Sequence, residues 1–188
     1  MFLEDWMSPK DRGRAAILSY HYEQAGSYEK AYHFKKEAAY KAALIYANSD
    51  AIQLYESAIE LLKKRLQKPD PAELWALTND LGKSYYLTGN SKRWIKVLKE
   101  QLELASEASN DLFLAKTHNN MGLFYEHEGN WDAASGHFKR AAELARRISD
   151  KLLSSRCLIN YGLLEMFVGS LVEAQRSFED ALQLARES

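Results

Sequence analysis

Residues 121–141 read MGLFYEHEGNWDAASGHFKRA, and residues 161–181 read YGLLEMFVGSLVEAQRSFEDA. Each stretch has a glycine at its second position and another glycine seven residues later, and a third such pair, Gly82 and Gly89, lies 40 residues before the first. Self-similarity at a fixed period of this length is typical of stacked helical repeats, in which one unit cannot bury its apolar face alone. The pattern therefore predicts an extended array, which usually works through a surface rather than through a catalytic pocket.

Helix-period apolar residues and local punctuation predict nine helices. Two of them begin with a capping residue followed by proline, at Ser8-Pro9 and at Asp70-Pro71. We read residues 1–188 as one array, with irregular repeats over 8–66 and regular repeats over 71–107, 111–147 and 151–186. The expected helices cover about residues 8–26, 28–46, 51–66, 71–88, 91–107, 111–128, 131–147, 151–168 and 171–186.

The turns of the regular repeats carry residues that suit their expected conformations. Each turn inside a pair of helices has a glycine that favours a left-handed C-terminal cap. Residues whose side chains can cap the next helix follow these turns and also stand between the pairs. The expected left-handed caps are Gly89, Gly129 and Gly169, and the expected N-caps are Asn90, Asn130 and residues within 109–111 and 149–150.

Composition limits the class of protein. The chain has 188 residues, of which 27% are charged and 46% are hydrophobic, and its formal net charge is −1. Phosphate binding needs a dense basic face, so we do not expect nucleic acid as the main partner. No apolar run approaches the roughly 20 residues of a membrane helix, and no signal-peptide pattern is present. Cys157 is the only cysteine, which excludes an internal disulfide and favours a reducing, cytoplasmic location.

Aligned on its glycines, the stretch from residue 121 reads Met-Gly-x-x-Tyr, then Gly-x-Trp-x-x-Ala, then Phe and Ala at positions 138 and 141. This order of small and aromatic residues resembles the tetratricopeptide repeat (TPR) family. The first glycine and the alanines lie where helices approach closely, and the large residues fill the gaps between pairs. The resemblance implies an all-α, right-handed superhelical solenoid of about nine antiparallel helices.

A narrower resemblance concerns the looser N-terminal third, including the stretch Tyr20–Gly26 and residues 46–52. These stretches resemble TPR regions that follow the ATPase domain in signalling proteins, such as predicted ATPases fused to cyclases and MalT-like regulators. The 40-residue period also resembles Pins-type scaffolds, which bind peptides. The chain has no Walker motif, and its last helix is not an obviously polar capping helix. If this narrower resemblance holds, the chain is the sensor or scaffold portion of a larger polypeptide.

The third unit departs from the family pattern. Trp94 stands where the family has alanine, and Gln101 replaces the second alanine. Two interpretations follow for Trp94: local repacking of the helix, which we favour, or a contact with a partner. Trp75 is another tryptophan that the repeat does not explain, so Trp75 and Trp94 are candidates for an unusual contact.

The TPR resemblance also implies that the first helix of each pair lines the concave face, where a peptide would bind. Asn120 and Asn160 share one repeat position and could form a ladder that hydrogen-bonds an extended peptide; alternatively, each satisfies a neighbouring helix terminus. Lys83, Lys116 and Arg156 would favour an acidic peptide, or they belong to a solvated charged face. The remaining residues assigned to this face are Asn79, Tyr86, Asn119, Leu123, Glu126, His127, Ile159, Leu163, Met166 and Phe167.

No motif predicts catalysis, a cofactor or a metal site. The five histidines show no metal-ligand spacing, Cys157 has the helix position of a core residue, and the chain has no nucleophile-elbow or phosphate-loop motif. The arrangement of Lys and Asn also differs from the carboxylate clamp of TPR proteins that grip chaperone C-termini. We expect a non-enzymatic module that binds a protein or peptide in its concave groove. The alternatives are a regulatory region acting on another domain of its own polypeptide, and self-association through the terminal helices.

Overall fold

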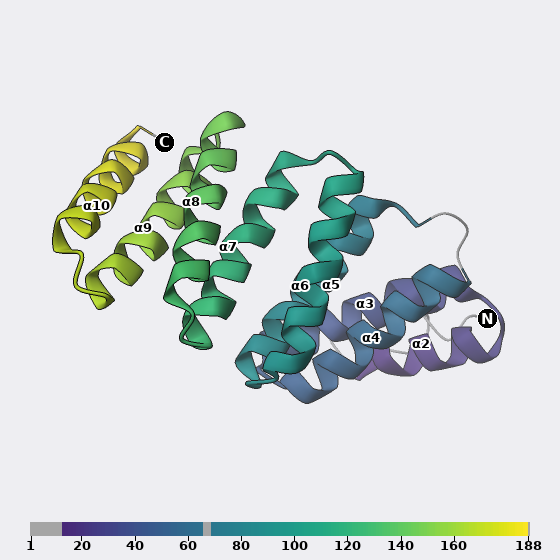
Figure 1. Cartoon of the computed structure of the whole chain (residues 1–188). Helices are drawn as coiled ribbons and strands as arrows, with labels where there is room; N and C mark the ends of the chain where they lie inside the picture. The colour runs from purple at the N-terminus through teal and green to yellow at the C-terminus, as the bar shows by residue number, and fades with distance from the viewer. Residues whose placement is uncertain (1–12, 66–68, 188) are drawn as a thin grey trace. The chain divides into compact units, whose positions relative to one another are not determined.

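The computed structural model describes residues 13–65 and 69–187, and their secondary structure consists of nine α-helices without strands (Figure 1). This confirms the predicted all-helical fold. The chain divides into two compact units, Met1–Val97 and Leu98–Ser188, which we call the N-terminal unit and the C-terminal unit. The predicted start of the first helix at Ser8-Pro9 lies outside the described residues. Within the described residues, the first helix begins at Arg14.

The N-terminal unit is a series of helices that each pack against the next. Its first core cluster joins Ala15 and Leu18 to Phe34 and Ala38 of the following helix. Because small residues alternate with large ones across this contact, the two helices approach closely without leaving a void. The helices are α2 (Arg14–Gln24), α3 (Tyr28–Leu44), α4 (Asn48–Lys64), α5 (Pro71–Leu87) and the first part of α6 (Ser91–Glu107).

The C-terminal unit is more regular. It contains the rest of α6 and the helices α7 (Asp111–His127), α8 (Trp131–Arg147), α9 (Lys151–Phe167) and α10 (Leu171–Arg186). Helix α8 packs between α7 and α9, and α9 packs against α10 (Figure 1). Cys157 is completely buried in a cluster with alanines of α8, which confirms its prediction as a core residue, and its burial raises the pKa of the thiol to about 12.

The turns confirm the predicted caps. Gly89, Gly129 and Gly169 have φ angles of 67°, 73° and 88°, the left-handed region that favours glycine. Side-chain oxygens then cap the next helices. The backbone N–H groups of Ala72, Arg93, Phe113, Ala133 and Leu153 donate to Asp70, Asn90, Asn110, Asn130 and Asp150, respectively.

The close approach predicted for the first glycine of a repeat is present in the last two repeats. A Cβ atom on Gly122 would lie 2.4 Å from the Phe138 ring, and one on Gly162 would lie 2.8 Å from the Phe178 ring. Both distances are shorter than carbon atoms tolerate. The glycine therefore creates the space that the aromatic side chain of the partner helix occupies.

Some predicted boundaries were wrong. Helix α3 ends at Leu44 rather than near Tyr46, because Tyr46 takes a left-handed φ of 59° in the turn. Helix α4 already includes Asn48, and Ala47 holds its N-cap position. The predicted end of that helix, Leu66, lies outside the described residues.

The two tryptophans that depart from the repeat pattern in the third unit are packed inside the protein. Trp75 and Trp94 are both only 4% exposed, so the interpretation of these indoles as a surface contact is not supported. The Trp94 ring lies 4.8 Å from the ring of Tyr86 between centroids, which accommodates the large side chain inside the N-terminal unit. Gln101 is completely buried, and its amide has no hydrogen-bond partner among the described residues.

Candidate functional site

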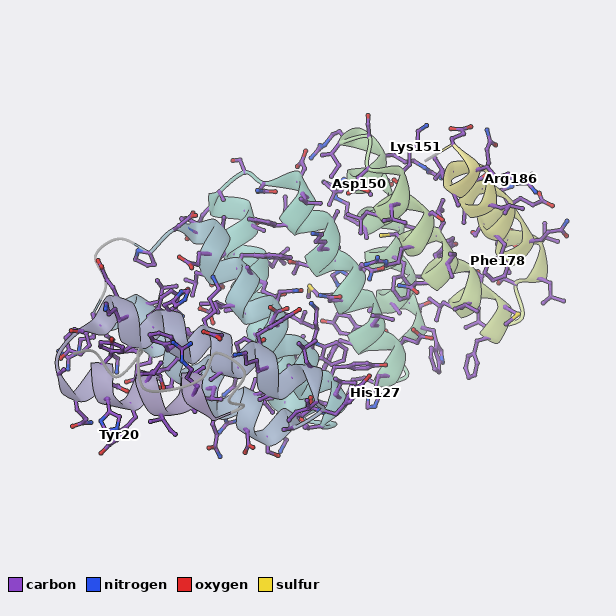
Figure 2. The ribbon with its side chains drawn as sticks, turned by 180° about the vertical axis from the view of Figure 1, so that it is seen from behind. Tyr20, His127, Asp150, Lys151, Phe178 and Arg186 are labelled. Atoms are coloured by element: carbon purple, nitrogen blue, oxygen red, sulfur yellow. The ribbon has the colours of Figure 1, made fainter. Side chains whose placement is uncertain are left out.

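The predicted concave-face residues of the C-terminal unit lie on α7 and α9, the first helices of its two pairs. Arg156, Leu163 and His127 are exposed, and His127 lies near the C-terminal end of α7 (Figure 2). The other residues of this set are less accessible. Lys116, Asn120, Leu123, Glu126 and Asn160 are half-buried.

Asn119 differs from the prediction. It is only 6% exposed, because α9 lies over it, and its Oδ1 accepts a hydrogen bond of 2.9 Å from Nδ2 of Asn160. This bond links equivalent faces of consecutive repeats. One donor of the proposed asparagine ladder is therefore already used inside the protein, whereas the side-chain carbonyl oxygen of Asn160 takes no part in this bond.

The exposed face of α9 carries a row of apolar side chains. Ile159, Leu163, Met166 and Phe167 are 43% to 70% exposed, and their spacing of three and four residues places them on one side of the helix. Phe167 extends the row toward α8, because its ring lies 4.9 Å from that of Trp131 between centroids. We call these four residues of α9 the α9 row.

Basic residues accompany the α9 row. Arg156 lies one turn before Ile159 and makes no ion pair within the part of the chain that the structure describes. His127 Nδ1 lies 3.5 Å from Oε1 of Glu128.

The predicted concave-face residues of the N-terminal unit lie on α5. Asn79 is half-buried, and the exposed Lys83 forms an ion pair of 2.8 Å with Asp80.

A histidine pair joins α7 to α8, and sequence spacing did not reveal it. The Nδ1 atoms of His118 and His137 lie 2.9 Å apart, and Tyr125 stacks on His137 with 5.2 Å between ring centroids. Burial, together with the neighbouring His137, lowers the pKa of His118 to about 4. Because the two residues are 19 positions apart on different helices, only their packing brings them together.

An apolar groove of about 360 Å³ runs over α10 and the end of α9. Phe178 lies between these two helices near their middle, and Lys151 and Arg186 mark one end of the pair (Figure 2). The groove is lined by Met166, Leu171, Ala174, Gln175, Phe178, Glu179 and Leu182.

A second groove lies entirely inside the N-terminal unit, between α3, α4 and α5. Its volume is about 370 Å³, and tyrosines and carboxylates dominate its lining. Sequence reasoning missed this groove. The lining residues are Tyr32, His33, Lys36, Glu37, Tyr40, Tyr55, Glu73, Ala76, Leu77 and Asp80.

Residues 13–65 and 69–187 contain no group of three or more His, Cys, Asp or Glu side chains placed to hold a metal ion. Within the same residues, each helix is too short or too polar to cross a membrane. The surfaces described above are therefore built from ordinary side chains on rigid helices.

Comparisons with known proteins agree with this architecture. The family model for the tetratricopeptide repeat matches residues 113–187. No curated protein sequence matches the chain. At sequence identities of 20% or less, the following structural similarities show the fold alone.

Three crystal structures of repeat proteins illustrate the similarity. BtubC (BKLC) from P. vanneervenii has a TM-score of 0.74 and 20% identity, over 94% of this chain and 70% of that chain. The apo form of RapI has a TM-score of 0.82 and 14% identity, over 94% of this chain and 48% of that chain. MamA has a TM-score of 0.62 and 17% identity, over 90% of this chain and 95% of that chain.

Proposed function

Because this chain belongs to the tetratricopeptide repeat family, whose repeats are generally protein–protein interaction modules, we propose that it binds a protein partner on the face formed by α7 and α9. The partner is a peptide or a helix of another protein, or another domain of the same polypeptide. The lone buried Cys157 and the ordinary soluble composition support a reducing compartment such as the cytoplasm.

The α9 row is the observation that carries this proposal. Exposed apolar side chains normally occur singly, and a contiguous group rimmed by polar residues marks an interaction site. Ile159, Leu163 and Met166 are separated by one helical turn each, which matches the spacing of an opposing helix or of alternate peptide side chains. These three side chains are 43% to 51% exposed, so burying the rest of each could supply about 1 kcal/mol before the costs of association.

The charged residues of the proposed surface indicate which kind of partner it would favour. Arg156 stands exposed at one end of the α9 row, and Lys116 occupies the equivalent position on α7. Glu126 is the half-buried acidic residue of this face, and burial raises the pKa of its carboxyl group. A partner with a carboxylate beside its apolar contact residues fits this surface best.

The direct test is photo-crosslinking. A photoreactive amino acid in place of Leu163 should form a covalent adduct with the partner in cells, because position 163 lies at the centre of the α9 row. The matched control carries the same group in place of Glu143, an exposed residue of α8 outside this face. Equal adducts at both positions would show that the partner does not use this face.

A second candidate function, self-association through α10, is favoured by the apolar groove on that helix. Leu171, Val172 and Leu182 are all more than half exposed there. Sedimentation velocity should then show a mass that rises with protein concentration, and Leu182→Glu should keep the protein monomeric. A monomer at all concentrations in the unchanged protein would exclude this candidate.

A further inference from the structure

A tyrosine hydroxyl without a protein partner lies in the lining of the groove of the N-terminal unit. Tyr55 is only 2% exposed, and its hydroxyl makes no hydrogen bond within residues 13–65 and 69–187. This hydroxyl is not among the enclosed polar atoms that lack a partner, so it reaches the open space of the groove. A phenol hydroxyl can both donate and accept, so a ligand in the groove could hydrogen-bond it.

The surroundings of Tyr55 are electronegative. Burial raises the pKa of Tyr55 to about 12, and the nearby carboxylate of Asp80 and the phenol of Tyr40 raise it in the same direction. Both of these neighbours also line the groove. The Tyr40 side chain is more than half exposed, so its ring is available at the mouth of the groove.

The groove lining carries more acidic than basic side chains, although each of its carboxylates has a lysine partner. Its lining includes three carboxylates but only one lysine, with one histidine in addition. Two of the carboxylates have internal partners. Glu73 accepts from Tyr32 at 2.6 Å and from Lys36 at 2.9 Å, and Glu37 pairs with Lys41 at 2.6 Å.

Asp80 is the carboxylate that a ligand could recruit. Its partner is Lys83, one turn away on the same helix, with a side chain that is 63% exposed. An exposed pair of this kind contributes little to stability, because water solvates both charges in its absence. A cation that enters the groove would therefore replace Lys83 at small cost.

From this geometry, we propose that the groove between α3, α4 and α5 binds the side chain of a lysine or arginine from a partner protein. Asp80 neutralises the charge, the Tyr55 hydroxyl accepts a hydrogen bond from the cationic group, and the Tyr40 ring packs against its stem or its face. This site is independent of the α9 row, because it lies in the other unit and selects the opposite charge.

The test is an NMR titration of the isotopically labelled full chain with Nα-acetyl-arginine methylamide. The neutral control probe is the corresponding citrulline derivative, which has nearly the same shape without the charge. We expect saturable shifts at residues of α3, α4 and α5 with a dissociation constant of roughly millimolar magnitude, as suits a single side chain, and no saturation with the citrulline probe.

Three variants make the test specific. Asp80→Asn should weaken binding of the arginine probe at least fivefold, and Tyr55→Phe, which removes only the hydroxyl, should weaken it at least twofold. Glu60→Gln removes an exposed carboxylate of α4 that pairs with Lys64 outside the groove and should leave binding unchanged. Equal shifts with both probes, shifts confined to other helices, or unchanged binding by Asp80→Asn would overturn the proposal.

Discussion

The two repeats of the C-terminal unit have equivalent positions 40 residues apart but bury them differently. Phe138 in α8 is completely buried, whereas its equivalent in α10, Phe178, is half-buried. Ala142 is 4% exposed, whereas Leu182 is 52% exposed. The reason is the next helix: Tyr161 and Leu164 of α9 pack over Phe138, and no helix follows α10 in the part of the chain that the structure describes.

The burial of a repeat position therefore depends on whether another helix packs over it. Asn119 is polar and buried, because α9 covers it and supplies a hydrogen bond. Its equivalent, Ile159, is apolar and exposed. The exposed apolar residues of α9 and α10 are therefore the positions where we propose that another molecule binds.

The largest expected effect separates the two phenylalanines. Phe138→Ala should lower the free energy of unfolding by about 3–5 kcal/mol, because it removes a fully buried ring from between α8 and α9. Phe178→Ala should cost less than half as much, since one side of that ring already faces the α10 groove. Urea denaturation followed by circular dichroism measures both; equal losses would contradict the comparison.

An exchange of residues between the repeats tests the same point with smaller changes. Ala142→Leu places the residue of position 182 into a covered site and should destabilise the protein by about 1–3 kcal/mol through overpacking. Leu182→Ala should change stability by no more than about 0.5 kcal/mol, as expected at an exposed position. If Ala142→Leu is tolerated, the contact between α8 and α9 is looser than described.

The asparagine bond should be worth less than the core contacts. Asn119→Ala should cost about 1–2 kcal/mol, because it removes the acceptor for Asn160 at a buried position. Ile159→Ala should be nearly neutral. A thermal or chemical melt of the two variants measures the difference, and no loss for Asn119→Ala would show that solvent replaces the bond.

The smallest expected effect is a dependence of the free energy of unfolding on pH, which only one of the two repeats should show. The pKa of His118 lies near 4 in the folded protein and near 6.5 when unfolded, so the unfolded state binds more protons between these values. Stability from this group is complete above pH 6.5, falls as the pH drops toward 4, and is constant below. The equivalent positions in the last repeat are Leu158 and Ser177, which do not titrate.

The double variant His118→Leu/His137→Ser, which installs those residues, should flatten the dependence. Stability measured by urea denaturation at a series of pH values tests this. A slope between pH 4 and 6.5 that persists in the double variant would assign the dependence to other groups.

Local chemistry made much of the fold predictable. Gly129 and Asn130 predict a turn through their own conformational preferences. Gly122 predicts a close contact, because only glycine leaves room for Phe138. Features that depend on neighbouring helices were not predictable from one sequence. The packing of neighbouring helices determines three of these features: the histidine pair, the burial of Asn119, and the position of the Tyr55 hydroxyl in the groove lining.

The candidate site was predictable only in part. The period of the repeat correctly places Arg156 and Leu163 on an exposed face of α9. The same reasoning favoured repacking around Trp94 but left a partner contact open for Trp75 and Trp94, and both side chains are only 4% exposed. It also missed the groove of the N-terminal unit, whose lining comes from three helices with no shared motif.

The most direct test of the central claim, that the face of α7 and α9 binds a protein, compares three forms of the chain in affinity capture with quantitative mass spectrometry. These are the unchanged protein, Leu163→Glu in the α9 row, and Leu44→Glu on α3 as a control at an exposed leucine outside the proposed surfaces, all with folding verified by circular dichroism. Our account predicts a partner that Leu163→Glu loses and Leu44→Glu retains. A partner that Leu163→Glu binds as well as the unchanged protein would contradict it.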